Sequence, residues 1–248
     1  MGILNVTPDS FADGGRYNSI NKAVHHARQM ISEGVDIIDI GGESTRPGAD
    51  RVSEEEELDR VIPVITQLAN DGVQISIDTM RASTARAAIV AGAKIINDVS
   101  GGLADPEMLT TAAELKTPYI AMHWRGQSKD MNSMAIYKDV VSDVISELQE
   151  RISAALDAGI SRDKLVIDPG IGFAKDAHHN WEIIDHIEEF VALGFPVLIG
   201  ASRKRFLGGD TPDEREAASI ALTKRLSTTG IWGVRVHSVK PHKDVFAK

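Results

Sequence analysis

One sequence unit repeats along this chain and constrains what it can fold into. Each copy is a short apolar run, rich in Ile and Val, that ends abruptly in polar or glycine residues, as in VDIIDIGGESTRPGA at residues 35–49. Such a run is typical of a parallel strand that is buried on both faces and opens at its end onto a site. Eight such runs occur, at residues 2–5, 36–41, 74–79, 94–99, 118–123, 164–170, 196–202 and 233–237.

Helix signals separate the apolar runs. Ser53 with Glu56 forms a capping box, and Thr211 with Glu214 forms another, with Pro212 at the first helical position. Glycines stand where helices should end, at positions 34, 92, 159, 194 and 230. The mean spacing of the runs is roughly thirty residues, the size of a βα unit. The pattern predicts an α/β protein, a single-domain (β/α)8 TIM barrel over residues 1–248, and an open doubly wound sheet would need fewer strands.

Composition excludes several classes of function. The chain has 248 residues, 42% of them hydrophobic, and has no apolar run near the ~20 residues that a membrane span requires. It has no cysteine, which excludes disulfides and thiolate metal sites and fits a cytoplasmic protein. The net charge of −9 argues against nucleic acid as a partner, so an anionic ligand must be met by locally concentrated Arg or Lys.

Polar residues stand at nearly every predicted strand end, which is where barrels of this kind place their sites. They are Asn5, Asp39, Asp78, Asn97, His123, Asp168, Ser202, Lys204, Arg235 and His237. Acidic and amide groups at positions 78, 97 and 168 suit a flat heterocycle with several N–H donors, such as an aminopyrimidinone. Arg235, His237 and Asn5 form a plausible phosphate or diphosphate corner. Two simpler interpretations stay open: Asp39 could be structural, and Arg235 could form an ion pair with an Asp at the barrel mouth.

The basic run Arg203-Lys204-Arg205 directly follows a predicted buried strand and precedes Phe206. At least one of these three side chains should therefore point inward, and its place two residues after Ser202 favours Lys204.

Seven blocks, in order, closely resemble the dihydropteroate synthase family. They are NVTPDSF (5–11), DIGGESTRPGA (39–49), IDT (77–79), INDVSG (96–101), DPGIGF (168–173), SRKRF (202–206) and VRVH (234–237). The resemblance runs from residue 1 to about residue 237. It implies an enzyme of folate biosynthesis that joins p-aminobenzoate to 6-hydroxymethyl-7,8-dihydropterin diphosphate, uses Mg²⁺, and releases diphosphate.

The resemblance also implies roles for matching residues. The pterin pocket would comprise Asp78, Asn97, Met122, Asp168, Phe173 and Lys204, of which Asp78, Asp168 and Lys204 would be catalytic. Asn5, Arg235 and His237 would bind the diphosphate, with Asn5 on the metal. The p-aminobenzoate site, where sulfonamides compete in this family, would comprise Phe11, Thr45, Arg46, Pro47, Ser202 and Arg205. A homodimer through the late helices is implied, although packing within the barrel explains the apolar residues of 217–226 equally.

The expected mechanism is an SN1-like displacement, because an aryl amine needs no strong base and the hard step is cleavage of the C–O bond at the pterin methylene. Two departures from the family stand out: Ser238 where an acidic residue is usual, and a short connection over residues 206–211. Three alternatives remain: a pterin-binding barrel without turnover, a pterin-binding methyltransferase barrel, which would not need the diphosphate corner, and a Schiff-base lyase that uses Lys204.

Overall fold

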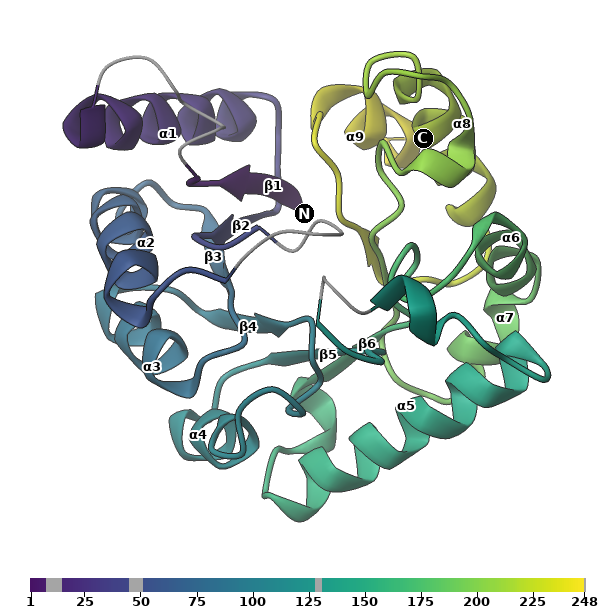
Figure 1. Ribbon diagram of the computed structural model, residues 1–248. Helices are drawn as coiled ribbons and strands as arrows, with labels where there is room; N and C mark the ends of the chain where they lie inside the picture. Colours follow the sequence, from purple (N-terminus) through teal and green to yellow (C-terminus); the bar gives the residue numbers. More distant parts are fainter. Residues whose placement is uncertain (8–14, 45–50, 128–130, 248) are drawn as a thin grey trace.

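The computed structural model describes residues 1–7, 15–44, 51–127 and 131–247. Strands alternate with helices, and the helices form an outer ring around the strands (Figure 1). The strands are β1 (Gly2–Asn5), β2 (Ile37–Gly41), β3 (Gln74–Asp78), β4 (Ile95–Asp98), β5 (Tyr119–Met122), β6 (Leu165–Asp168), β7 (Leu198–Ile199) and β8 (Gly233–Val234). The helices are α1 (Gly15–Ser32), α2 (Glu54–Leu68), α3 (Ala82–Ala91), α4 (Met108–Leu115), α5 (Val140–Asp157), α6 (Ala177–Asp185), α7 (Ile187–Val191), α8 (Glu216–Leu226) and α9 (Lys240–Phe246).

The strands are parallel and follow one another in sequence order. Strands β1 to β6 form one sheet, and β7 pairs with β8 in a second. Two single bridges join the sheets into a ring: Ile167 of β6 bridges Val197, and Gly2 of β1 bridges Val236. The backbone N–H of Ile3 also donates to the carbonyl of Val236 at 2.9 Å. The predicted TIM barrel is therefore confirmed, with its seventh and eighth strands shorter than the apolar runs suggested.

Strand periodicity explains which residues reach the interior of the barrel. Ile37, Ile95, Ile120, Val166 and Leu198 form a small apolar cluster of their own, separate from the large core between strands and helices. Successive side chains on a strand point to opposite faces, so the residue two positions further on points inward as well. That rule places Asp39, Asn97, Met122 and Asp168 above the apolar cluster, toward the carboxyl ends of the strands.

Helix boundaries test the capping signals. Ser53 caps α2 as predicted, with its hydroxyl accepting from the Glu56 N–H at 3.2 Å. At the second predicted capping box, Thr211 Oγ1 accepts the Glu214 N–H at 3.3 Å, but the predicted helix start was wrong, because α8 begins at Glu216. The Arg215 guanidinium donates to the carbonyls of Gly209 and Asp210 and holds residues 211–215 in a turn before the helix. Among the helices of the described segments, none is both long and apolar enough to cross a membrane.

Candidate active site

Arg235 lies at the centre of a charged cluster inside the barrel. Its Nε donates to Asp39 Oδ2 at 2.6 Å, and its Nη2 donates to Asp78 Oδ2 at 2.7 Å. Asn97 Nδ2 donates to the same oxygen of Asp39 at 2.9 Å. Asp39 has no solvent exposure, and its Oδ1 has no hydrogen-bond partner. The open interpretation of Arg235 as a barrel-mouth ion pair thus describes this structure, and the partners are two aspartates rather than one.

The burial of Asp78 changes its protonation. Desolvation raises the pKa of Asp78 to about 7, against the opposing effect of Arg235, and the carboxylates of Asp39, Glu57 and Asp98 raise it further. Arg235 stays charged, since its pKa is raised by Asp39 and Asp78 in spite of burial. A carboxyl group that titrates near neutrality beside a fixed cation is typical of functional sites.

Asp168 and Lys204 form a second group, together with the connection that follows β6. Asp168 Oδ1 accepts the Gly170 N–H at 2.7 Å, and burial raises the pKa of Asp168. Lys204 Nζ donates to the Ile171 carbonyl and lies 4.5 Å from the centre of the Phe173 ring. Burial lowers the pKa of Lys204 to about 8, although Asp168 opposes the shift. The side chain of Lys204 therefore points inward, as its position after Ser202 predicted.

The backbone at Arg203 separates Ser202 from Lys204. Arg203 has a φ of 58°, in the left-handed region. Its N–H donates to Ser219 Oγ at 2.9 Å, and its Nε donates to Glu216 at 2.6 Å, so both contacts fix the turn to α8. Ser202 then faces His237, whose N–H and Nδ1 lie 3.2 and 3.1 Å from the serine Oγ. The structure thus joins two residues that the sequence interpretation had placed in different subsites.

Ser238, one of the two departures noted in the sequence, contacts a carboxylate on α8. The hydroxyl of Ser238 donates to Glu216 Oε1, and His242 Nε2 lies 3.4 Å from the same oxygen.

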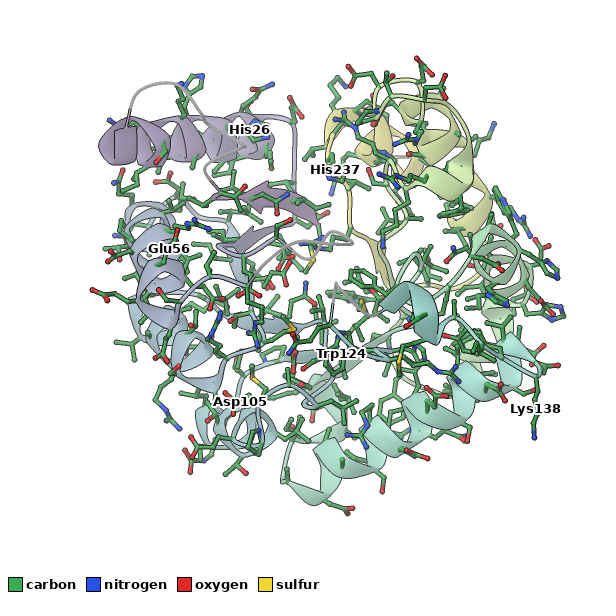
Figure 2. The ribbon with its side chains drawn as sticks, in the orientation of Figure 1. His26, Glu56, Asp105, Trp124, Lys138 and His237 are labelled. Carbon is green, nitrogen blue, oxygen red and sulfur yellow. The ribbon has the colours of Figure 1, made fainter. Side chains whose placement is uncertain are left out.

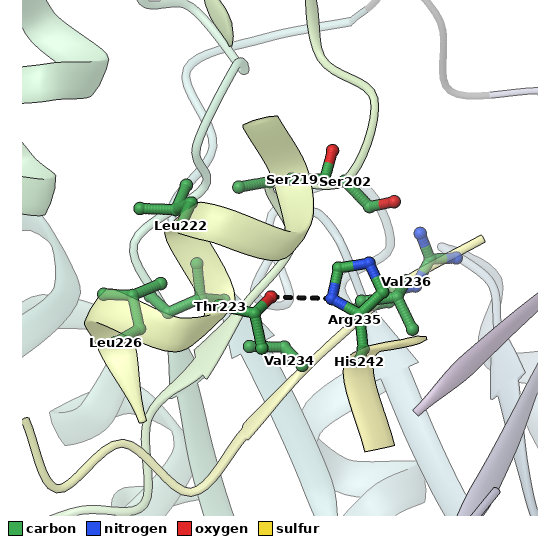
Figure 3. A pocket seen from close by; sticks show the side chains of 11 residues that line it. Ser202, Ser219, Leu222, Thr223, Leu226, Val234, Arg235, Val236 and His242 are labelled. Atoms are coloured by element: carbon green, nitrogen blue, oxygen red, sulfur yellow. Dashed lines mark hydrogen bonds between the residues drawn. The ribbon is translucent and has the colours of Figure 1, made fainter. Parts of the chain in front are cut away.

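A small pocket lies behind these residues, between β7, β8 and α8 (Figure 3). Its lining is mainly apolar, with Leu222, Leu226 and Val234, and His242 Nδ1 contacts Thr223 Oγ1 at 2.7 Å inside it. It belongs to the packing of α8 on the strands, because the charged groups of the barrel interior, apart from Arg235, do not line it.

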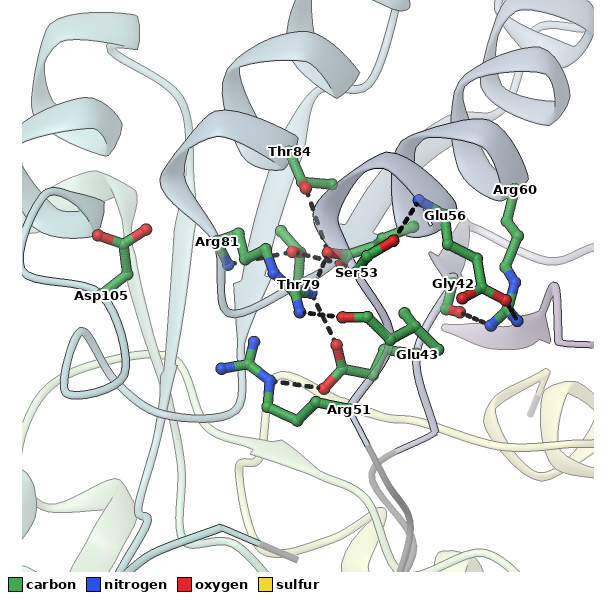
Figure 4. Close-up of polar contacts among 12 residues, drawn as sticks. Gly42, Glu43, Arg51, Ser53, Glu56, Arg60, Thr79, Arg81, Thr84 and Asp105 are labelled. Carbon is green, nitrogen blue, oxygen red and sulfur yellow. Dashed lines mark hydrogen bonds and ion pairs between the residues drawn. The ribbon is translucent and has the colours of Figure 1, made fainter.

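A network around Arg81 connects the ends of β2 and β3 with α2 (Figure 4). Arg81 donates to Glu57 and Glu43 and to the carbonyl of Val52, while Thr79 and Thr84 donate to Glu57. Glu43 also accepts from Arg51 Nε at 2.9 Å. This network ties residue 43 to residues 51 and 52, on either side of the undescribed residues 45–50.

The remaining predicted residues fall into three groups. Asn5 ends β1 and is half-buried, and Met122 ends β5 and is buried. Arg205 is exposed in a short 3-10 turn, Arg205–Leu207. Phe11, Thr45, Arg46 and Pro47 lie outside the described residues. In Figure 2, His237 and Trp124 lie nearer the middle of the ring of strands and helices, whereas Lys138 and Glu56 lie on its outside.

Three polar residues beneath the site escaped the sequence interpretation: Lys175, Glu147 and Asn180. Asn180 Oδ1 accepts the Gly172 N–H at 2.6 Å, and Lys175 Nζ lies 2.9 Å from His123 Nδ1. The only sequence signal was the position of Lys175 and Asn180 shortly after the DPGIGF block.

Comparisons with known proteins show which family the chain resembles over nearly its whole length. A family model described as pterin binding enzyme matches residues 1–237. The dihydropteroate synthase of Mycobacterium leprae is 47% identical over 98% of this chain and 89% of its own length. Two solved structures of dihydropteroate synthase from Xanthomonas albilineans, one with 4-aminobenzoic acid and one with 7,8-dihydropteroate, are 44% and 41% identical. They match with TM-scores of 0.93 and 0.89, over 99% of this chain and 89% and 90% of theirs.

The chain belongs to the pterin-binding enzyme family, and it shares the barrel fold of the solved structures. Its activity within that family is that of a dihydropteroate synthase, a transferase of the pterinylmethyl group in folate biosynthesis.

Proposed function

We propose that residues 1–248 form one pterin-binding barrel domain that joins the two substrates inside the ring of strand ends. The observation that carries the proposal is the inward set of Asp78, Asn97 and Asp168 with Lys204 beside it. Carboxylates and an amide oxygen accept the N–H donors of an aminopyrimidinone, and the ammonium group donates to its acceptors. The relatives from X. albilineans hold 4-aminobenzoic acid and 7,8-dihydropteroate, the second substrate and the product of this reaction.

The ion pairs of Arg235 rearrange when the pterin binds. The N–H groups of the pterin replace the hydrogen bond from Arg235 Nη2 to Asp78, while the hydrogen bond from Nε keeps Arg235 attached to Asp39. The released end of the guanidinium is then available to the diphosphate of the same substrate. A guanidinium suits this task because it presents several N–H donors in a fixed plane.

The chemical step is cleavage of the C–O bond at the pterin methylene. Positive charge that develops on the pterin is stabilised by the buried carboxylates of Asp78 and Asp168. Arg235 and His237 stabilise the negative charge on the departing diphosphate. The amine of p-aminobenzoate is neutral at pH 7 and attacks the methylene carbon, so no side chain has to act as a strong base.

Mg²⁺ fits the residues at the diphosphate corner. Mg²⁺ prefers oxygen ligands and is commonly held by one or two protein groups, substrate phosphates and water. Asn5 provides one amide oxygen at the end of β1, and no cluster of three His, Cys, Asp or Glu side chains that could cage a metal occurs among the described residues. Asn5 would be one ligand of the ion, which would neutralise charge on the leaving group.

The rest of the assignment concerns the second substrate and the assembly. We place p-aminobenzoate between Ser202, Arg205 and the undescribed residues Phe11, Thr45, Arg46 and Pro47. The position of Ser202 against His237 supports a second substrate beside the diphosphate corner. A homodimer and a cytoplasmic location remain expectations from the sequence.

One assay tests the proposed function. The purified chain is incubated with 6-hydroxymethyl-7,8-dihydropterin diphosphate, p-aminobenzoate and Mg²⁺, and 7,8-dihydropteroate is measured. Asp168→Asn should lower kcat roughly 100- to 1,000-fold without loss of folding, because it removes a charge aimed at the developing cation. Asp163→Asn is the matched control, an exposed aspartate before the other end of β6. Full activity in Asp168→Asn would refute the assigned role.

A further inference from the structure

The connection between β6 and α6, residues 169–176, has one face toward the candidate site. Asp168 is held by the Gly170 N–H, the Ile171 carbonyl accepts from Lys204, and the Phe173 ring lies next to the same ammonium group. Gly172 approaches Lys204 so closely that an added Cβ would lie 2.7 Å from Lys204 Cδ. The path of this connection therefore determines where two of the three proposed catalytic groups lie.

The other face of the connection rests on Lys175. Lys175 Nζ donates to the Gly170 carbonyl at 3.2 Å and to the Phe173 carbonyl at 3.1 Å, and its third partner is His123 Nδ1 at 2.9 Å. An ammonium group has three N–H donors, and all three are used. No carboxylate in the described segments contacts Lys175 Nζ, so its charge serves to hold two backbone carbonyls rather than to form an ion pair.

The partners of His123 complete a chain of hydrogen bonds. Burial lowers the pKa of His123 to about 4, so its ring is neutral. Because Nδ1 accepts from Lys175, the proton lies on Nε2, which donates to Glu147 Oε2 at 2.9 Å. Glu147 is held in turn by Arg125 Nε at 2.9 Å. The order Lys175, His123, Glu147, Arg125 thus runs from the β6–α6 connection through the end of β5 to Glu147 on helix α5, and back to Arg125 after β5.

The backbone of the connection is strained, which shows that it is held in place. Ala174 has a φ of 47°, and its carbonyl accepts from the Tyr137 hydroxyl at 2.9 Å. A Cβ on Gly170 would lie only 2.4 Å from the carbonyl oxygen of His123. A non-glycine residue in the left-handed region is strained and persists only where the surroundings determine it.

We propose that Lys175 is a positioning residue: held by His123 and Glu147, it fixes the carbonyls of Gly170 and Phe173 and thereby sets Asp168, Phe173 and Lys204 for the pterin. This inference rests on the proposed function, since it assigns the pterin to those three residues. Lys175 acts through the backbone and does not touch the substrate.

The test compares Lys175→Met with Lys164→Met. Both lysines donate to backbone carbonyls, but Lys164 binds the Lys116 carbonyl before the opposite end of β6. Steady-state kinetics are measured at about pH 6, because burial lowers the pKa of Lys175 to about 7 and the ammonium form should prevail. Lys175→Met should raise KM for the pterin diphosphate roughly tenfold to a hundredfold, since two carbonyls lose a charged donor. KM for p-aminobenzoate should stay within about twofold, and Lys175→Arg, which keeps the charge, should recover part of the loss.

A second pair covers the case in which Lys175→Met does not fold. His123→Asn keeps an acceptor near the position of Nδ1, whereas His123→Leu removes it, so the asparagine variant should bind the pterin more tightly. Equal affinity in these two, or an unchanged pterin KM in a folded Lys175→Met, would overturn the inference.

Calorimetry with 6-hydroxymethylpterin separates this inference from the proposed function. A wild-type chain that binds this pterin but makes no dihydropteroate would refute the function, while the comparison of binding among the variants would still decide the role of Lys175. Normal turnover in the wild type with unchanged pterin affinity in every variant would refute the role of Lys175 alone.

Discussion

The buried carboxyl group of Asp78 lowers the stability of the folded protein when it is ionised. The protein places its carboxyl group in the interior, where desolvation opposes the charged form more strongly than Arg235 favours it. A residue shaped only for stability would be uncharged at this position.

Asp78→Asn should therefore change the pH dependence of stability. The pKa of Asp78 is raised from 3.8 to about 7 on folding. Between these values the folded protein keeps a proton that the unfolded chain releases, so stability falls as pH rises through this window. The asparagine variant lacks this loss and should exceed the wild type at pH 8 by an amount on the order of 1 kcal/mol. Urea unfolding at about pH 4 and pH 8 measures the difference, which should vanish at the lower pH; a difference independent of pH would contradict the assignment.

Sequence reasoning was most successful for residues on strands. Asn97 and Asp168 each lie two positions after an inward apolar residue, so a strand period of two is enough to place them inside the barrel. The partners of Arg235 could not be obtained in this way, because they come from β2 and β3 and depend on how the ring closes. Glu147 was missed because a glutamate within a long amphipathic helix has the same pattern as one on a solvated face.

The buried carboxylate of Glu57 on α2 accepts hydrogen bonds from Thr79 after β3 and from Thr84 on α3, so it connects both helices to a strand end. Glu57 of α2 is 1% exposed, and Arg81 before α3 is 17% exposed. A buried charge that loses its partner is costly, and the cost falls on the junction of two βα units.

Arg81→Met should destabilise the protein by about 3–5 kcal/mol, because it leaves Glu57 buried without its cation. Arg86→Met is the control on α3, since Arg86 and Glu114 form a pair that is 48% and 58% exposed. That variant should lose less than about 1 kcal/mol. Urea denaturation of both variants gives the comparison, and similar losses would show that the buried network contributes nothing special.

Element boundaries were harder to predict than element order. The apolar run 196–202 yields only a two-residue strand, because Ser202 and Arg203 turn toward His237 and α8. The sequence shows which residues of the run are apolar and which are polar. Where the strand pairing stops depends on contacts with side chains from distant elements, which a local pattern does not contain.

In the molecule as a whole, the strands of the ring are not paired equally well with their neighbours. Six strands form a continuous sheet, whereas β7 and β8 are short and are joined to it by one bridge on each side. Arg235 and His237 follow β8, so most of the proposed diphosphate corner lies in the segment with the fewest strand pairs.

Native-state hydrogen exchange should detect this inequality. Amides of β7, β8 and α8 should exchange through openings of lower free energy than those of β2 to β5, because fewer backbone hydrogen bonds hold them. The pterin diphosphate with Mg²⁺ should raise protection in the first group more than in the second. Equal protection throughout the ring would contradict the expectation.

Because Arg235 is paired with two aspartates, the pterin end of the substrate should bind before its diphosphate end. Free diphosphate must compete with Asp39 and Asp78 for a single guanidinium, and it brings nothing to replace that cation at either carboxylate. A pterin head group brings its own donors for Asp78. Under the proposed function, an isolated phosphate should therefore bind this guanidinium more weakly than one attached to the pterin ring.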